Sequence, residues 1–258
     1  MNNLPEFMWG GYNADDPQII IAPDERPGPI MYSDGGNMLN PASLLFKERI
    51  LRFYGVVNGA SAAALQEQLL SLDALAHDGA MNKDITLYIN SPGGNVLDGL
   101  MVYDTMTHIK SNISTVVTGM AASMATVFMI AGAKGKRYAL PNATIMLHET
   151  SSSLGPTKTS QQKPTLDMRD KLLTKLEDIY LQHMNRDNDG IFSAFGGKTN
   201  MSTIDDMVPT KMNESEFRNW FHEWLEKDRY IFADQAVELG LIDAVLEPHK
   251  LPHYQLSK

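Results

Sequence analysis

The stretch that most constrains the fold runs from residue 113 to residue 133 and contains no charged side chain. It is long enough to span a bilayer, because a transmembrane helix needs about 20 apolar residues. However, the stretch is rich in Gly, Ala, Ser and Thr, and Gly119 divides it into a β-branched run and a run with helical character. The sequence therefore predicts a buried strand at 113–117 and a buried helix at 123–133, and no membrane span.

Short apolar runs alternate with helical patterns on both sides of this stretch. Further strands are predicted at 50–57, 85–90, 136–140 and 144–148, and further helices at 43–48, 60–76 and 96–109. Strands that alternate with helices favour βαβ crossovers, so the predicted fold class is α/β. A chain of 258 residues with 43% hydrophobic residues is expected to form one domain with peripheral additions.

The pattern divides the chain into three parts. Residues 1–40 hold many Pro, Gly, Asn and Asp residues, which favours a flexible or partner-ordered arm with at most a short strand at 19–22. Residues 41–246 form the predicted domain, and 247–258 a tail. Within the domain, a long helix is predicted at 165–184 after a polar segment at 151–164, and 185–200 is predicted to be loop. The last predicted elements are helices at 214–226 and 233–239 and a strand at 241–246.

Composition excludes several classes of function. The net charge of -9 argues against a nucleic-acid partner, because phosphate binding needs a basic face. The absence of cysteine excludes disulfides, a thiol nucleophile and thiolate metal sites. Residues 1–10 contain no basic residue and carry Glu6, so no secretory signal is expected and a cytoplasmic location is predicted.

No cofactor or metal is expected either. His249 and His253 have the spacing of two ligands on one helical turn, but Pro248 and Pro252 make a helix there unfavourable. The chain also lacks the glycine-rich loop with Lys and Ser or Thr that binds nucleotide phosphates. Any ATP requirement would therefore belong to a partner.

Ser123 is the candidate nucleophile that local sequence suggests. It lies where the predicted strand passes into the predicted helix, among Gly and Ala side chains too small to cover its hydroxyl. A serine nucleophile needs a positioned base and aimed N–H groups for the oxyanion, and the helix start and the Gly93-Gly94 loop are suited to provide those donors. Residue types alone leave open that Ser123 is only an N-cap and His148 only a polar residue at a strand end.

Four blocks of the chain resemble the ClpP family of serine peptidases in order and spacing. They are YINSPGG at 88–94, GMAASMA at 119–125, AGAKGKR at 131–137 and MLH at 146–148. A fifth block at 226–243 resembles the family segment that carries the triad aspartate, here Asp228. The resemblance covers roughly residues 43–150 and 223–246.

This resemblance implies a catalytic triad of Ser123, His148 and Asp228, with the backbone N–H groups of Gly94 and Met124 as the oxyanion hole. It also implies a crotonase-like spiral of βαβ units with a protruding handle helix, at about 151–184, followed by an insertion at about 185–221. Such subunits form heptameric rings that pair into a tetradecamer. They cleave unfolded polypeptides fed by an AAA+ unfoldase ATPase.

The sequence departs from the family pattern in the insertion, in the segment 149–155, which lacks the usual glycine-rich strand, and at two single positions. Lys227 replaces an arginine and cannot reproduce its bidentate contacts, and His108 replaces an aromatic residue. Three alternatives stay open: a phage head-maturation protease that acts without an ATPase, a catalytically silent ring subunit, and an acyl-CoA enzyme of the crotonase superfamily, which shares the spiral fold and an oxyanion hole.

Overall fold

The computed structural model describes residues 32–34, 37–39, 41–76, 84–149, 159–184, 190–196, 208–248 and 251. The chain divides into two compact units, Met1–Leu45 and Phe46–Lys258. In the first unit, β1 (Tyr32–Asp34) and β2 (Asn37–Leu39) form an antiparallel hairpin. Helix α1 (Pro41–Lys47) follows and contains the boundary between the two units. The short strand predicted at 19–22 lies outside the described residues.

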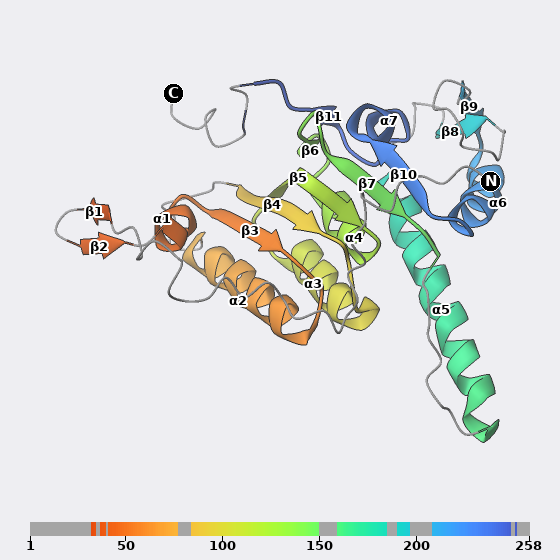
Figure 1. Ribbon diagram of the computed structural model, residues 1–258, viewed down its shortest axis with the longest axis horizontal. Helices are drawn as coiled ribbons and strands as arrows, with labels where there is room; N and C mark the ends of the chain where they lie inside the picture. The colour runs from red at the N-terminus through yellow and green to blue at the C-terminus, as the bar shows by residue number, and fades with distance from the viewer. Residues whose placement is uncertain are drawn as a thin grey trace, which may run out of the picture. The chain divides into compact units, whose positions relative to one another are not determined.

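A seven-stranded sheet organises the second unit (Figure 1). Its main path is β10-β7-β5-β4-β3, and β6 joins β5 and carries β11. All of its pairings are parallel except the one between β10 and β7. The strands are β3 (Ile50–Tyr54), β4 (Ile85–Ser91), β5 (Ile113–Ala122), β6 (Arg137–Ala139), β7 (Thr144–Leu147), β10 (Arg229–Phe232) and β11 (Ala244–Val245). The predicted α/β class is confirmed.

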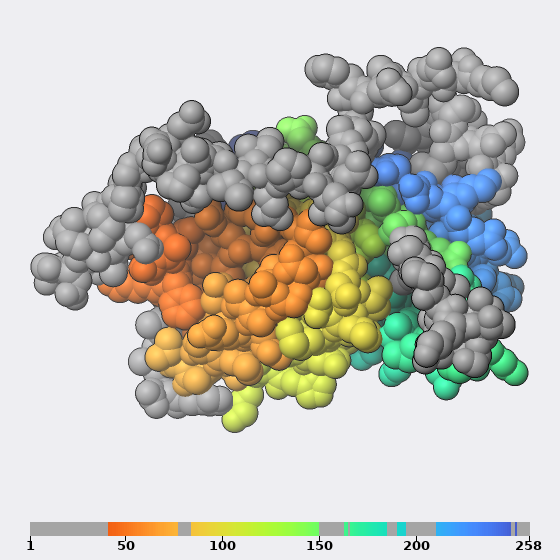
Figure 2. Space-filling view, turned by 60° about the horizontal axis from the view of Figure 1, so that its bottom comes forward, coloured from red at the N-terminus to blue at the C-terminus, as the bar shows by residue number. Residues whose placement is uncertain are grey.

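Two helices cover one face of this sheet, α2 (Gly59–Ala76) and α3 (Val96–His108), and they lie side by side in orange and yellow in Figure 2. Their amphipathic pattern explains the packing. Helix α2 buries Ala62, Leu65, Leu69 and Leu72, which recur at intervals of three and four residues and so share one face. Strand β4 buries every residue of one face, and its other face changes from buried Thr86 to exposed Asn90.

The uncharged stretch at 113–133 folds into β5 and α4 (Met124–Ile130), and every residue of α4 is buried. The strand is longer than predicted, because its ladder continues past Gly119 as β5 leaves β6 and pairs with β7. Gly119 does not end the strand; a β-carbon there would meet the Asn90 side chain at 2.7 Å. Among the residues that the structure describes, no helix is long and apolar enough to cross a membrane.

Helix α5 (Thr159–His183) begins earlier than the predicted start near residue 165 and continues through Pro164. The polar segment at 151–164 gave no helical periodicity, but the beginning of α5 projects away from the sheet (Figure 1) and therefore needs no apolar face. Leu166 and Met168 are 40% and 48% exposed, whereas Leu176, Ile179 and Tyr180, nearer the end of the helix, are buried.

The prediction of loop throughout 185–200 is wrong. Strand β8 (Phe192–Gly196) pairs antiparallel with β9 (Val208–Met212), and α6 (Glu214–Leu225) follows. Phe192 is fully buried and stacks on Phe217 of α6, with ring centroids 4.6 Å apart. The hairpin is stable because it packs on a helix. The sequence of residues 185–200, which is rich in Gly, Asn and Asp, does not include that helix and so could not predict the strand.

Helix α6 begins with a complete capping box. The Asn213 side chain accepts a hydrogen bond from the Glu216 N–H, and the Glu216 carboxylate accepts one from the Asn213 N–H. We expect Asn213→Ala to lower the free energy of unfolding by about 1 kcal/mol, because a helix N–H loses its partner. Urea unfolding at matched protein concentration measures this, and an unchanged midpoint would contradict it.

Helix α7 (Ala233–Glu238) lies between β10 and the last strand. Strand β10 was not predicted, and β11 is shorter than the predicted strand at 241–246. A buried arginine joins this region to α5. Arg137 is 1% exposed, donates to the Asp243 carboxylate through Nε and a terminal nitrogen, and donates through the other to the His183 carbonyl. This network fixes the end of α5 against the sheet.

Candidate active site

Ser123 lies on the tight turn between β5 and α4. Its backbone angles are φ 51° and ψ -126°, a region that non-glycine residues seldom adopt and that stores strain. Its N–H donates to the Met146 carbonyl at 2.8 Å, which holds the turn against β7. Ser123 stands at the N-cap position of α4, but its side chain makes no capping hydrogen bond. The simple N-cap interpretation is therefore excluded.

The Ser123 hydroxyl instead contacts His148, which follows β7. The distance between Ser123 Oγ and His148 Nε2 is 2.8 Å, and the other ring nitrogen, Nδ1, lies 3.4 Å from Asp228 Oδ1. The imidazole is 22% exposed and the carboxylate 60% exposed. The three predicted side chains are thus brought together in one row, with the carboxylate at its solvent side.

Sheet register explains why Asp228 reaches His148. Strands β7 and β10 are antiparallel, and Arg229 is paired with Leu147. The residue before Arg229 must then lie opposite the residue after Leu147, which places Asp228 beside His148. A second contact supports this corner, because the Glu149 N–H donates to the Leu225 carbonyl at 2.7 Å.

The Gly93-Gly94 loop lies against the Ser123 turn. A β-carbon on Gly93 would meet the Ala122 carbonyl oxygen at 2.5 Å and the Met124 nitrogen at 2.9 Å, so only glycine fits there without displacement. The loop is fixed on its other side by Val57, whose N–H donates to the Gly93 carbonyl at 2.7 Å. Met124 begins α4, and the N–H groups of a first helical turn lack intrahelical partners. Backbone donors are therefore concentrated beside the Ser123 hydroxyl.

Two side chains that the sequence did not indicate, Thr126 and Tyr180, stabilise the Ser123 turn through hydrogen bonds. Thr126 Oγ1 donates to the Ser123 carbonyl at 2.6 Å, and the Tyr180 hydroxyl of α5 lies 2.5 Å from Thr126 Oγ1. Because the Thr126 proton is used on Ser123, Tyr180 is the donor in the second bond. Burial raises the pKa of Tyr180 to about 12, so its hydroxyl stays protonated near neutral pH. No local pattern identifies this pair.

We expect Tyr180→Phe to lower kcat about fivefold with little change in KM. The variant removes one hydrogen bond next to Ser123, which contributes about 1 kcal/mol, and keeps the aromatic ring in place. Hydrolysis of a peptide, the activity that the family resemblance implies, separates the two constants when it is measured at several substrate concentrations. Tyr138→Phe is the matched control, since that hydroxyl donates to the Gly135 carbonyl instead. A change in KM alone would show that Tyr180 acts on substrate binding.

A narrow apolar slot opens beside Ser123 and His148. Its walls include Val96, Val127, Leu176 and Tyr180, and Glu177 is the one acidic side chain in the described part of its lining. Among the described residues, no three His, Asp or Glu side chains converge as metal ligands. The site thus offers a hydroxyl, an imidazole, a carboxylate and backbone N–H groups.

A hydroxyl on a strained turn, hydrogen-bonded to an imidazole that approaches a carboxylate, is the arrangement found in the serine hydrolase class. Comparison with known proteins narrows the class. Residues 33–249 match the family model described as Clp protease. Two relatives named ATP-dependent Clp protease proteolytic subunit, from Dehalococcoides mccartyi strains BAV1 and CBDB1, are each 38% identical over 205 residues, which is 80% of this chain and 85% of the relative. This chain belongs to the Clp protease family, a family of peptidases.

Proposed function

We propose that this chain is a serine endopeptidase, the proteolytic subunit of a Clp-type protease. The observation that carries the proposal is the 2.8 Å contact between Ser123 Oγ and His148 Nε2 on a strained turn. A serine hydroxyl is a weak nucleophile at neutral pH and needs an adjacent base. Strain at Ser123 and a side chain that makes no capping bond are the features of a hydroxyl placed for attack rather than for helix capping.

In this mechanism, Ser123 Oγ attacks the scissile carbonyl while His148 Nε2 takes its proton and later gives it to the leaving amine. Asp228 holds the imidazole in the tautomer that carries its proton on Nδ1 and stabilises the imidazolium when it forms. The N–H groups of Gly94 and Met124 donate to the oxyanion of the tetrahedral intermediate. Water then hydrolyses the acyl-enzyme with His148 acting again as the base. No cofactor takes part.

The proposed substrates are unfolded polypeptides, delivered by an AAA+ ATPase to a ring of seven copies or a pair of such rings. The relatives are named as the proteolytic subunit of an ATP-dependent protease, and this supports a partner ATPase over a head-maturation protease that acts without one. The contact between Ser123 and His148 favours an active subunit over a catalytically silent one. The family match favours proteolysis over acyl-CoA chemistry.

Labelling with a fluorophosphonate tests the proposal, because this probe reacts only with an activated serine. We expect one adduct, on Ser123, found by mass spectrometry of the digested protein, and none in Ser123→Ala. Ser91→Ala is the matched control, because Ser91 is a nearby serine whose hydroxyl is buried in the loop. That hydroxyl accepts a hydrogen bond from the Gly93 N–H. Labelling at another serine, or none in assembled protein that also lacks peptidase activity, would overturn the proposed mechanism.

A further inference from the structure

A second cavity adjoins the slot beside Ser123. Its volume is about 370 Å³, and three residues, Leu173, Glu177 and Leu225, line both spaces. The slot is walled mainly by apolar side chains, whereas the second cavity is lined mainly by polar and charged ones. The slot has room for little more than a water molecule, at about 20 Å³, so a substrate held at Ser123 lies beside a larger polar chamber that shares walls with the slot.

Glu177 stands at the junction and is only 7% exposed. Its Oε1 accepts a hydrogen bond from His222 Nδ1 at 2.6 Å. A carboxylate has about four acceptor positions, and among the described residues His222 is the one hydrogen-bonding partner found for this group. In the described part of the chain, Arg49 Nε is the one side-chain polar atom that is fully buried and has no hydrogen-bond partner. Glu177 Oε2 is therefore not fully buried, and Glu177 lines the cavity. A buried carboxylate of this kind favours a donor that comes from outside.

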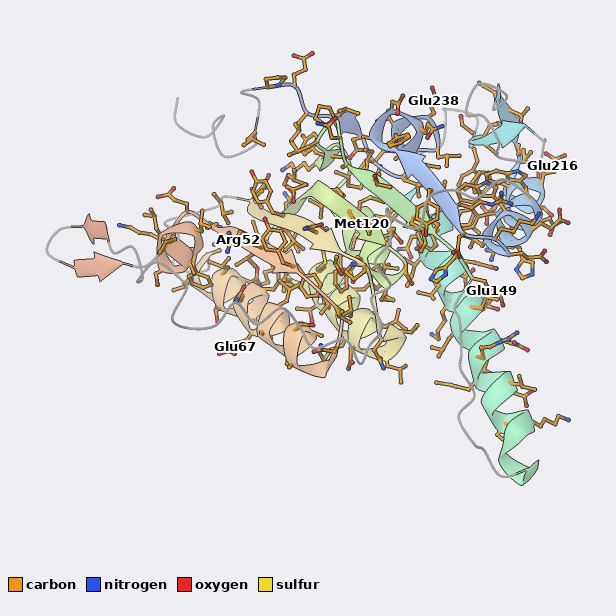
Figure 3. All side chains as sticks on the ribbon, viewed as in Figure 1. Arg52, Glu67, Met120, Glu149, Glu216 and Glu238 are labelled. Atoms are coloured by element: carbon orange, nitrogen blue, oxygen red, sulfur yellow. The ribbon has the colours of Figure 1, made fainter. Side chains whose placement is uncertain are left out.

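The chamber around Glu177 carries an excess of negative charge. Among the described residues that line it, Glu149, Asp170 and Glu226 are also acidic, against one guanidinium, that of Arg169, and the imidazole of His222. Arg169 already lies 3.2 Å from Asp170 and 3.7 Å from Glu149. Figure 3 shows Glu149 where the end of β7 approaches α5.

His222 does not remove this excess. Its hydrogen bond to Glu177, together with nearby carboxylates, raises the pKa of the imidazole. Even when both Arg169 and His222 are charged, four carboxylates face two cations within the described lining of the chamber. The chamber therefore remains favourable for one more positive group.

We propose that this cavity is a substrate subsite for the side chain of a lysine or arginine residue next to the scissile bond. The aliphatic stem packs on Leu173 and Leu225, and the charged end reaches Glu177, which combines apolar and ionic contacts as long basic side chains commonly do. The inference rests on the proposed function, because it takes Ser123 as the group that attacks the substrate. It adds a substrate preference that the apolar slot alone would not give.

Matched peptides test the preference. One peptide carries arginine at the candidate position, and the other carries citrulline, which has nearly the same shape without the charge. We expect wild-type protein to cleave the arginine peptide with at least tenfold higher kcat/KM. In Glu177→Gln this ratio falls to about threefold or less. Asp178→Asn is the matched control, because this neighbouring carboxylate of α5 pairs with Arg218 and does not line the cavity. The control keeps the wild-type ratio.

Equal kcat/KM for the two peptides in wild-type protein would overturn the inference, and so would equal changes in Glu177→Gln and Asp178→Asn. A Glu177→Gln protein with altered particle mass and an unaltered ratio would assign the cavity to contacts between copies and overturn it as well. Binding of the same peptides to Ser123→Ala, measured by calorimetry, separates this inference from the proposed function. Preferential binding of the arginine peptide supports the subsite even if the fluorophosphonate does not label Ser123. Equal binding of the two peptides contradicts the subsite even if Ser123 is labelled.

Discussion

An Asp228→Asn variant is expected to hydrolyse peptides 10²- to 10⁴-fold more slowly than the wild type, with the loss in kcat. Asparagine has nearly the same shape, but its amide does not favour the proton on His148 Nδ1, so Nε2 is less often free to accept the Ser123 proton. In serine proteases with a buried aspartate, the same exchange costs about 10⁴. Asp228 is 60% exposed and lies 3.4 Å from His148 Nδ1, so solvent weakens its effect on the imidazole. The expected loss of rate is therefore as small as about 10²-fold at the lower end.

Two measurements isolate this effect. Steady-state hydrolysis gives kcat, and chemical unfolding gives stability, which should change by no more than about 0.5 kcal/mol because the side chain is on the surface. Asp234→Asn removes an exposed carboxylate from the start of α7 and should leave kcat unchanged. An Asp228→Asn protein that keeps kcat within a factor of three would show that another group orients His148.

The sequence was sufficient to predict the elements whose pattern is local. Helix α2 and strand β4 follow from regular apolar spacing, and their predicted bounds agree with the structure to within one residue. Strand β8 was missed because it is stabilised by Phe217, which lies in a later helix. The early start of α5 was missed because a helix that projects into solvent carries no apolar stripe.

The candidate site divides in the same way. Ser123 has a local signature, since it lies between a strand and a helix among small side chains. The position of Asp228 depends on the register between β7 and β10, which no local pattern contains, and only the family resemblance indicated it. Thr126 and Tyr180 act through contacts between α4 and α5, distant in sequence, so they became visible only in the folded chain. The catalytic roles of these residues stay predictions.

The loop opposite Ser123 provides the second large effect. We expect Gly93→Ala to lower the rate of acylation by about 10²- to 10³-fold, the loss that follows removal of one oxyanion donor. The added methyl group would lie 2.7 Å from Ser123 Cβ and 2.9 Å from the Met124 nitrogen, so the loop or the turn must move away. Either movement displaces the N–H groups of Gly94 and Met124 from the carbonyl under attack.

Backbone strain is the competing explanation, because Gly93 has φ +90° and alanine is disfavoured there in any surroundings. Gly135→Ala separates the two causes. Gly135 has φ +81°, but a β-carbon there would meet nothing within 4 Å, and the residue lies in the turn before β6. Gly135→Ala should lose about 1 kcal/mol of stability from backbone strain alone, and Gly93→Ala should lose more, because its methyl group also meets the Ser123 turn. Only Gly93→Ala should slow the single-turnover release of product from an activated ester. Equal rates in the two variants would mean that the loop does not stabilise the oxyanion, and the donors would have to be sought elsewhere around Ser123.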